Sequence, residues 1–168
     1  NFSKMKIAVI GAGNGGQAIA GYLASKGHIV NIYDRDEAKI DDIQKIGHIK
    51  LIGKINCCGK LNIVTADIKR AIDDTNVIMV TTTANAHADV AQSIAQYLHN
   101  GQIIVLNPGR TCGALVFKQA LKKSGCTKRI YIGEAQTLVY ACRLIKNGEV
   151  NIIGVKDEVL LSGLPSSD

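Results

Sequence analysis

The feature that constrains this chain most is a cluster of six glycines in the segment "VIGAGNGGQAIAGYLASKG", residues 9–27. Glycine weakens regular secondary structure, so glycines placed directly before a helical pattern need a local cause. Either the backbone turns sharply at this point, or another group comes very close to it.

Strand and helix patterns alternate along the first three quarters of the chain. Short apolar runs bounded by turn residues predict strands at residues 6–10, 28–34, 61–65, 76–82 and 102–107. Helical spacing between them predicts helices near residues 18–27, 37–46, 67–72, 87–98 and 113–123, with Asp67 as the N-cap of the third. Four of the strands are almost entirely apolar, which is typical of a parallel sheet covered on both faces.

Two segments depart from this alternation. Residues 49–57 alternate apolar and polar side chains around Gly53 and Lys54, which predicts an inserted hairpin. The last quarter holds successive strand patterns at residues 129–134, 137–143, 150–155 and 158–163, which indicate antiparallel strands added at an edge. We therefore predict one α/β domain over residues 1–168, a doubly wound and mostly parallel sheet with helices on both faces.

The glycines fit the pattern G-x-G-x-x-G at Gly11, Gly13 and Gly16, after a strand and at the start of a helix. Asp34 ends the second strand, 18 residues after Gly16, which is close to the spacing of about 20 in the dinucleotide-binding fingerprint. Gly11 would allow the tight turn, Gly13 would leave room for a pyrophosphate, and Gly16 would let the helix approach the sheet. The alternative is a tight strand–helix turn without a ligand.

The residue at the end of the second strand predicts the coenzyme. A carboxylate at Asp34 would accept hydrogen bonds from the adenosine ribose hydroxyls and repel a 2′-phosphate, so NAD(H) is favoured. Arg35 follows directly and would soften that preference, so NADP(H) stays open as a second coenzyme.

The ends of two further strands should lie beside the same ligand. Thr81, Thr82 and Ala84 follow one strand and are expected near the adenosine ribose and the pyrophosphate. Asn107 and Pro108 follow the next and are expected nearer the nicotinamide.

Three charged or titratable residues have two interpretations each. Arg110 either grips a substrate carboxylate through paired hydrogen bonds or is a solvent-facing loop arginine. His87 either lies at the surface or a helix cap, or lines the cofactor cleft. Glu134 either pairs with Arg143 or stands at the entrance of the cleft.

Composition excludes several other classes. The net charge is +6, but the lysines are scattered and aromatic residues are only 4%, so we expect no nucleic-acid partner. No segment approaches the ~20 apolar residues of a membrane span. Five cysteines without metal or redox spacing predict reduced thiols in a cytoplasmic protein, with a soft-metal site at Cys57 and Cys58 as a remote alternative and no metal site expected.

Four segments together resemble the N-terminal domain of the NAD/NADP octopine/nopaline (opine) dehydrogenase family. They are "KIAVIGAGNGGQAIAGYLASKGH", "VIMVTTTANAHADVAQSIAQYL", "GQIIVLNPGRTCGALVF" and "EAQTLVYACR", and the resemblance covers nearly the whole chain. The glycine fingerprint is common to many Rossmann proteins, whereas "NPGR" followed by "YACR" is more particular to this family.

The resemblance implies a function. Family members reductively condense an amino acid with a 2-oxo acid, and the coenzyme delivers a hydride to the resulting C=N bond. The resemblance implies that the pyrophosphate is held at Gly11, Gly13, Asn14, Gly15 and Gly16, and that Arg110 contacts the oxo acid. The family's acid/base pair belongs to a second, helical domain, which is absent from these residues, so we expect the chain to bind coenzyme without catalysis and assign it no catalytic residue.

Other interpretations stay open at this stage. The chain is also compatible with the cofactor domain of a ketopantoate reductase-like or glycerol-3-phosphate dehydrogenase-like oxidoreductase, or with a non-catalytic NAD-sensing module. If the chain is part of a longer protein, we expect another domain or a homodimer to cover Leu160, Leu161 and Leu164 near its end.

Overall fold

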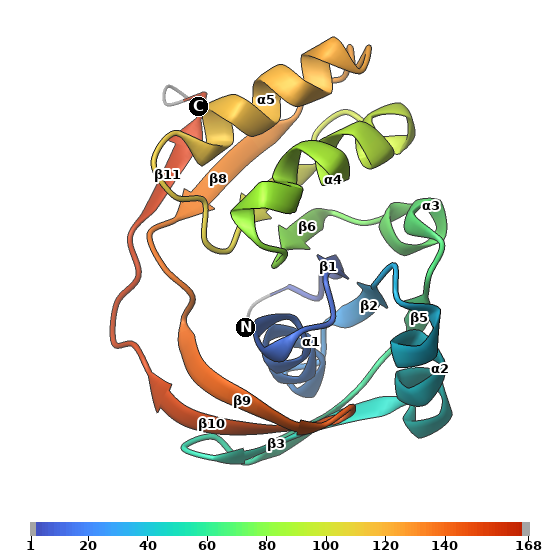
Figure 1. The fold of residues 1–168 in the computed structure, drawn as a ribbon, viewed down its shortest axis with the longest axis vertical. Helices are drawn as coiled ribbons and strands as arrows, with labels where there is room; N and C mark the ends of the chain where they lie inside the picture. The colour runs from blue at the N-terminus through green and yellow to red at the C-terminus, as the bar shows by residue number, and fades with distance from the viewer. Residues whose placement is uncertain (1–2, 166–168) are drawn as a thin grey trace.

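A computed structural model describes residues 3–165, which form two sheets and five α-helices (Figure 1). The larger sheet has seven strands in the order β11-β8-β7-β6-β1-β2-β5. Their bounds are β1 Lys6–Ile10, β2 Ile29–Tyr33, β5 Ile63–Thr65, β6 Val77–Val80, β7 Ile103–Leu106, β8 Tyr131–Ala135 and β11 Leu161–Leu164.

The large sheet is parallel except at one edge. β1 pairs in parallel with β2 on one side and with β6 on the other, and β7 and β8 continue the parallel order. Only β11, among the described strands of this sheet, runs antiparallel, with Leu161 opposite Ala135. The predicted fold class is therefore confirmed, including an antiparallel strand added at the edge near the C-terminus.

The smaller sheet has the order β4-β3-β10-β9 and was not expected as a separate layer. The predicted hairpin is confirmed as β3 His48–Gly53 and β4 Cys57–Lys60, but it recruits β9 Tyr140–Lys146 and β10 Glu149–Val155, which do not join the edge of the large sheet. The inward side chains explain this placement, because Leu51, Val150 and Ile152 pack with α1 residues in one buried cluster.

Helices cover both faces of the large sheet. α3 Ile68–Ile72, α4 His87–Ile94 and α5 Gly113–Lys123 lie on one face, and short 3₁₀ turns flank α4 at Ala84–Ala86 and Ala95–Tyr97. α1 Asn14–Ser25 lies on the opposite face, between the large sheet and the small one (Figure 1). α2 Glu37–Ile46 packs against β5 and β3 on the same side as α1.

The central strand, β1, contributes side chains to the hydrophobic cores on both faces of the large sheet. Ile7 and Val9 face the cluster around α1, whereas Ala8 and Ile10 face the cluster beneath α3, α4 and α5. This period-two burial of apolar side chains on both faces explains why the strand is apolar throughout. Within residues 3–165, no helix has the length and apolarity that a membrane crossing requires.

Candidate functional site

The strand order creates one crevice at the carboxyl ends of the strands. From β1 the chain builds β2 and β5 to one side, then returns to build β6, β7 and β8 on the other. In such a sheet a ligand binds outside the carboxyl ends of the strands at the point where the order reverses. Here that point lies between β1 and β6, where the glycine turn and the threonines after β6 meet.

The glycine turn is built by close backbone approaches. Gly11 has φ +104°, a conformation that other residues rarely adopt, and its N–H donates to the Tyr33 carbonyl at 2.8 Å. A Cβ at Gly16 would overlap the Gly11 carbonyl oxygen and lie 2.8 Å from Thr81 Oγ1. A Cβ at Gly13 would meet nothing within 4 Å, so this glycine faces open space.

The N-terminus of α1 is available to an anion. Gly13 is its N-cap, no side chain among residues 3–165 is seen to cap the helix, and its first turn holds no acidic residue. The backbone N–H groups of this turn and the helix dipole therefore lack the partner that most helix starts have. By contrast, Asp36 caps α2 and Asp67 caps α3 through side-chain hydrogen bonds, the latter as predicted.

Two of the five residues predicted to hold the pyrophosphate also contact the small sheet or the segment that leads into it. The side-chain oxygen of Asn14 accepts a hydrogen bond from the Leu144 N–H of β9 at 3.1 Å. A Cβ at Gly15 would lie 2.8 Å from Leu138 Cδ2, so Gly15 lets the segment before β9 pack against α1. These contacts join the glycine turn to the small sheet, whose presence as a separate layer was not predicted.

Asp34 is held as a carboxylate directly beside the turn. Its Oδ2 accepts from Ala12 N–H at 2.8 Å and from Lys39 Nζ at 3.3 Å, and its Oδ1 accepts from Asp36 N–H at 3.0 Å. Burial acts most strongly on this group and raises its pKa, but the two backbone donors and Lys39 together outweigh burial. The net effect lowers the pKa of Asp34 below its ordinary value of 3.8.

A pocket of about 410 Å³ opens beside Asp34. Of the predicted site residues, Gly11, Asp34, Arg35 and Thr82 line it. The lining residues that come from helices were not predicted, because no sequence motif marks them. These include Lys39 and Ile68 from α2 and α3, with Ala86, Asp89, Val90 and Ser93 at α4.

The threonines after β6 differ in role. Thr81 Oγ1 lies 3.0 Å from the Ile10 carbonyl and 2.9 Å from the Gly11 carbonyl, to which it donates, so it ties β6 to the glycine turn. Thr82 Oγ1 is buried and has no partner among the described residues, although Thr82 lines the pocket. Ala84 begins the 3₁₀ turn that leads to α4.

His87 lies in the core, so the interpretation that placed it at the surface is wrong. It is 3% exposed and packs edge-on against Phe117 of α5, with ring centroids 6.3 Å apart. It is not among the residues that line the pocket beside Asp34. Burial lowers the pKa of His87, opposed in part by a hydrogen bond with the Thr82 backbone. The packing of α4 against α5 buries this first residue of α4, which a lone histidine in the sequence did not reveal.

Asn107 lies at the end of β7, next to the crevice. It is 6% exposed, and its side-chain amide donates to the Val105 carbonyl at 2.9 Å. Pro108 follows and is half-buried.

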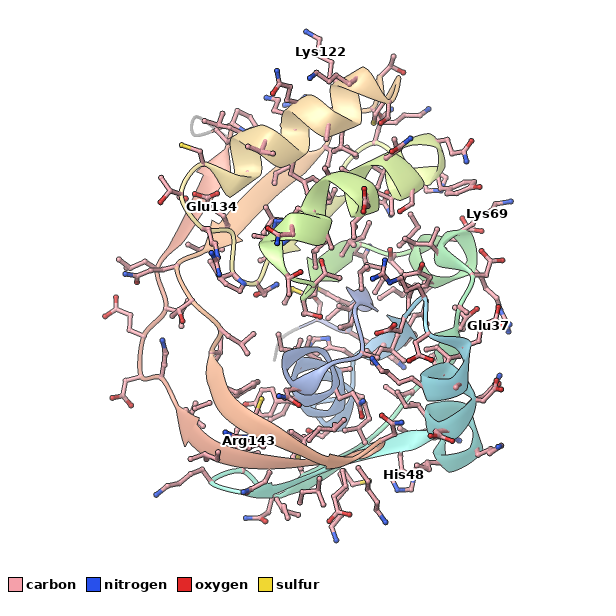
Figure 2. All side chains as sticks on the ribbon, in the orientation of Figure 1. Glu37, His48, Lys69, Lys122, Glu134 and Arg143 are labelled. Atoms are coloured by element: carbon pink, nitrogen blue, oxygen red, sulfur yellow. The ribbon has the colours of Figure 1, made fainter. Side chains whose placement is uncertain are left out.

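Arg110 and Glu134 line a second pocket, of about 620 Å³, between the end of β8 and the start of β11. Arg110 is exposed, whereas Glu134 Oε2 accepts a hydrogen bond from the Ala114 N–H in the first turn of α5 at 2.6 Å. The expected pairing of Glu134 with Arg143 is wrong. Figure 2 shows Glu134 beside β8 and Arg143 on the small sheet, because β9 leaves the large sheet.

A doubly wound sheet with a glycine turn, an uncapped first helix and an acid after the second strand defines a Rossmann-type nucleotide-binding domain. The sequence model described as NAD-dependent glycerol-3-phosphate dehydrogenase N-terminus matches residues 6–111, and the chain belongs to this family. The resemblance to the N-terminal Rossmann domain of opine dehydrogenases is also confirmed. An opine dehydrogenase of Arthrobacter sp. is 38% identical over 161 residues, which are 95% of this chain and 45% of that protein.

Further relatives agree with the fold. A glycerol-3-phosphate dehydrogenase of Carboxydothermus hydrogenoformans is 32% identical over 101 residues, 60% of this chain and 30% of that protein. The structure of octopine dehydrogenase with NADH and pyruvate superposes with a TM-score of 0.86 at 23% identity, covering 98% of this chain and 44% of that one. Yersinopine dehydrogenase with NADP⁺ bound gives 0.78 at 14% identity, covering 96% and 41%. The chain spans less than half the length of these proteins.

Proposed function

We propose that this chain is the coenzyme-binding part of an opine-type dehydrogenase, an enzyme that reductively condenses an amino acid with a 2-oxo acid. One observation carries the proposal most directly. The uncapped N-terminus of α1 faces open space at Gly13, at the carboxyl ends of the strands where the order reverses. A dinucleotide diphosphate is the ligand that this arrangement of N–H groups fits.

The proposal assigns the coenzyme contacts as follows. The glycine turn and the first turn of α1 hold the diphosphate. The Asp34 carboxylate accepts hydrogen bonds from the hydroxyls of the adenosine ribose. Thr81, Thr82 and Ala84 lie beside the ribose and diphosphate, and Asn107 and Pro108 lie nearer the nicotinamide. The bound coenzyme supplies the hydride for the C=N bond. His87, which one interpretation of the sequence placed at the cleft, is buried and hydrogen-bonded to the Thr82 backbone, so it would affect the coenzyme only through Thr82.

The substrate contacts are proposed at the second pocket. The exposed guanidinium of Arg110 is the cation there that would pair with a carboxylate of the 2-oxo acid. Glu134 lines the same pocket and holds the start of α5 behind it. No residue of this chain is assigned as the general acid or base, which we propose lies in a separate helical domain of the full-length enzyme.

A second candidate is the coenzyme domain of a glycerol-3-phosphate dehydrogenase, which the family match over residues 6–111 favours. The likeness to opine dehydrogenase extends over 161 residues and so includes the second pocket and most of the small sheet. This difference in extent supports the opine-type reaction. Ketopantoate reductase-like chemistry and a non-catalytic NAD-sensing role are the remaining alternatives.

Fluorescence titration of the 168-residue chain with NADH tests the coenzyme assignment. We expect saturable binding that Asp34→Ala weakens by about tenfold or more, since it removes charged hydrogen-bond acceptors. Asp41→Ala, an exposed acid on α2, serves as the control. Absence of NADH binding to the unaltered chain would refute the assignment.

An assay of the full-length enzyme tests the reaction. We expect NADH to be consumed when pyruvate and an amino acid are both present. Consumption with the oxo acid alone would refute the opine-type reaction. Consumption with dihydroxyacetone phosphate would establish the second candidate.

We propose a cytoplasmic enzyme, supported by five cysteines that are all free. We also propose a homodimer that covers Leu160 and Leu161, which are 61% and 62% exposed. Light scattering of the purified protein measures the mass, and a monomeric mass contradicts the dimer.

A further inference from the structure

The carboxylate of Asp34 does not face the coenzyme pocket as a free negative charge. Three donors already bind it: two backbone N–H groups and, at 3.3 Å, the ammonium of Lys39. The side chains of Asp34 and Lys39 are 14% and 28% exposed, so solvent screens this pair less than it would screen a pair at the open surface.

Lys39 reaches this position because of how α2 begins. The side chain of Asp36 caps the helix and accepts from the Lys39 N–H at 3.2 Å. This cap places Lys39 in the first turn, with its side chain directed back over the end of β2. The flexible four-carbon stem of a lysine lets its ammonium move between neighbouring acceptors.

The charges that line the pocket balance. Asp34 and Asp89 contribute two carboxylates, and Arg35 and Lys39 contribute two cations. Without Lys39 the pocket would carry a net negative charge and repel a phosphate on the adenosine ribose. With Lys39, a cation already lies beside the carboxylate that contacts the ribose in the proposed function.

We propose that Lys39 is a specificity-determining residue, which offsets the charge of Asp34 and allows the pocket to accept a 2′-phosphorylated dinucleotide as well as the unphosphorylated one. The inference rests on the proposed function, because it requires a dinucleotide in this pocket. In the phosphorylated complex the Lys39 ammonium leaves Asp34 and pairs with the 2′-phosphate. In the unphosphorylated complex it stays on Asp34.

Titration of the 168-residue chain with NADPH and with NADH, read by nicotinamide fluorescence, tests this inference. We expect both to bind, and Lys39→Met to lower the NADPH-to-NADH affinity ratio by about tenfold or more, as loss of a charged hydrogen bond predicts. Lys45→Met removes a lysine from the exposed end of α2 and should leave the ratio unchanged. Adenosine 2′,5′-bisphosphate and 5′-AMP, used as competitors, should show the same shift and so locate it at the adenosine ribose.

The outcomes separate the two proposals. If neither dinucleotide binds the unaltered chain, the proposed function fails, and this inference with it. If NADH binds and NADPH does not, or if Lys39→Met leaves the ratio unchanged, only the inference on Lys39 is overturned. A shift produced by Arg35→Gln and not by Lys39→Met also overturns it, because Arg35 is then the selective cation. Thermal unfolding of each variant shows that the comparison is between folded proteins.

Discussion

Glu134, at the carboxyl end of β8, accepts a hydrogen bond from the backbone N–H of Ala114 in the first turn of α5 at 2.6 Å. α5 has no cap from its own N-cap residue, Cys112, which lies in the left-handed region at φ +61°. A side chain 20 residues further along the chain therefore supplies both the acceptor and the negative charge that a helix start favours.

This contact predicts a stability change. Glu134→Ala should lower the free energy of unfolding by about 1 kcal/mol, the usual effect of losing a helix cap. Glu134→Gln keeps an acceptor oxygen and should lose roughly half as much. Urea unfolding of the chain measures both, with the exposed Glu158→Gln as control. Equal stability of Glu134→Ala and the unaltered chain would show that another group caps the helix.

Substitution by alanine should have different effects at two glycines of the turn. A Cβ at Gly16 overlaps the Gly11 carbonyl, so Gly16→Ala should lose about 3 kcal/mol or more, or fail to fold. A Cβ at Gly13 meets nothing within 4 Å, so Gly13→Ala should stay within about 1 kcal/mol of the unaltered chain. Because the same Cβ enters the space assigned to the diphosphate, NADH affinity should fall about tenfold or more. Gly13→Ala with unaltered NADH affinity would place the diphosphate elsewhere.

Buried His87 should make the fold sensitive to acid. Burial lowers its pKa in the folded chain, so the unfolded chain binds a proton first as the pH falls below about 6.5. Above that pH the neutral ring contributes its full stability. As the pH falls from there towards the pKa of His87 in the folded chain, this contribution is lost. The slope approaches about 1.4 kcal/mol per pH unit.

Urea unfolding between neutral pH and pH 5 measures this decline. His87→Gln should remove that slope, whereas the same substitution at exposed His48 should retain it. An unchanged slope in His87→Gln would assign the acid sensitivity to other groups.

Arg110 should affect the oxo acid and not the coenzyme. In the full-length enzyme, Arg110→Ala should raise the KM for the 2-oxo acid by about tenfold or more, since a paired guanidinium–carboxylate contact is lost. NADH affinity should hold, because Arg110 lines the second pocket and not the one beside Asp34. Arg143→Ala, on the small sheet, is the matched control. A KM equal to that of the unaltered enzyme removes Arg110 from the substrate site.

Local sequence determined the parts of the fold that depend on near neighbours. The bounds of α2 and α5 were predicted to the residue. In the structure Asp36 and Gly47 cap the two ends of α2, and an amphipathic run forms α5. The glycine turn followed from its spacing, because only a strand–turn–helix unit makes use of glycine at all three positions. Asp34 followed from its distance along the chain.

Tertiary structure decided where the predicted elements lie. Periodicity shows which face of a strand is apolar, but not which layer that face covers. The patterns of β9 and β10 therefore fit strands at the edge of the large sheet as well as strands of a separate sheet. The pairing of β10 with β3 joins residues about a hundred positions apart, with Glu149 opposite Lys50, and β9 pairs in turn with β10. The burial of His87, the cap from Glu134 and the contact of Lys39 with Asp34 arise in the same way, because each depends on packing between elements and not on the pattern within one.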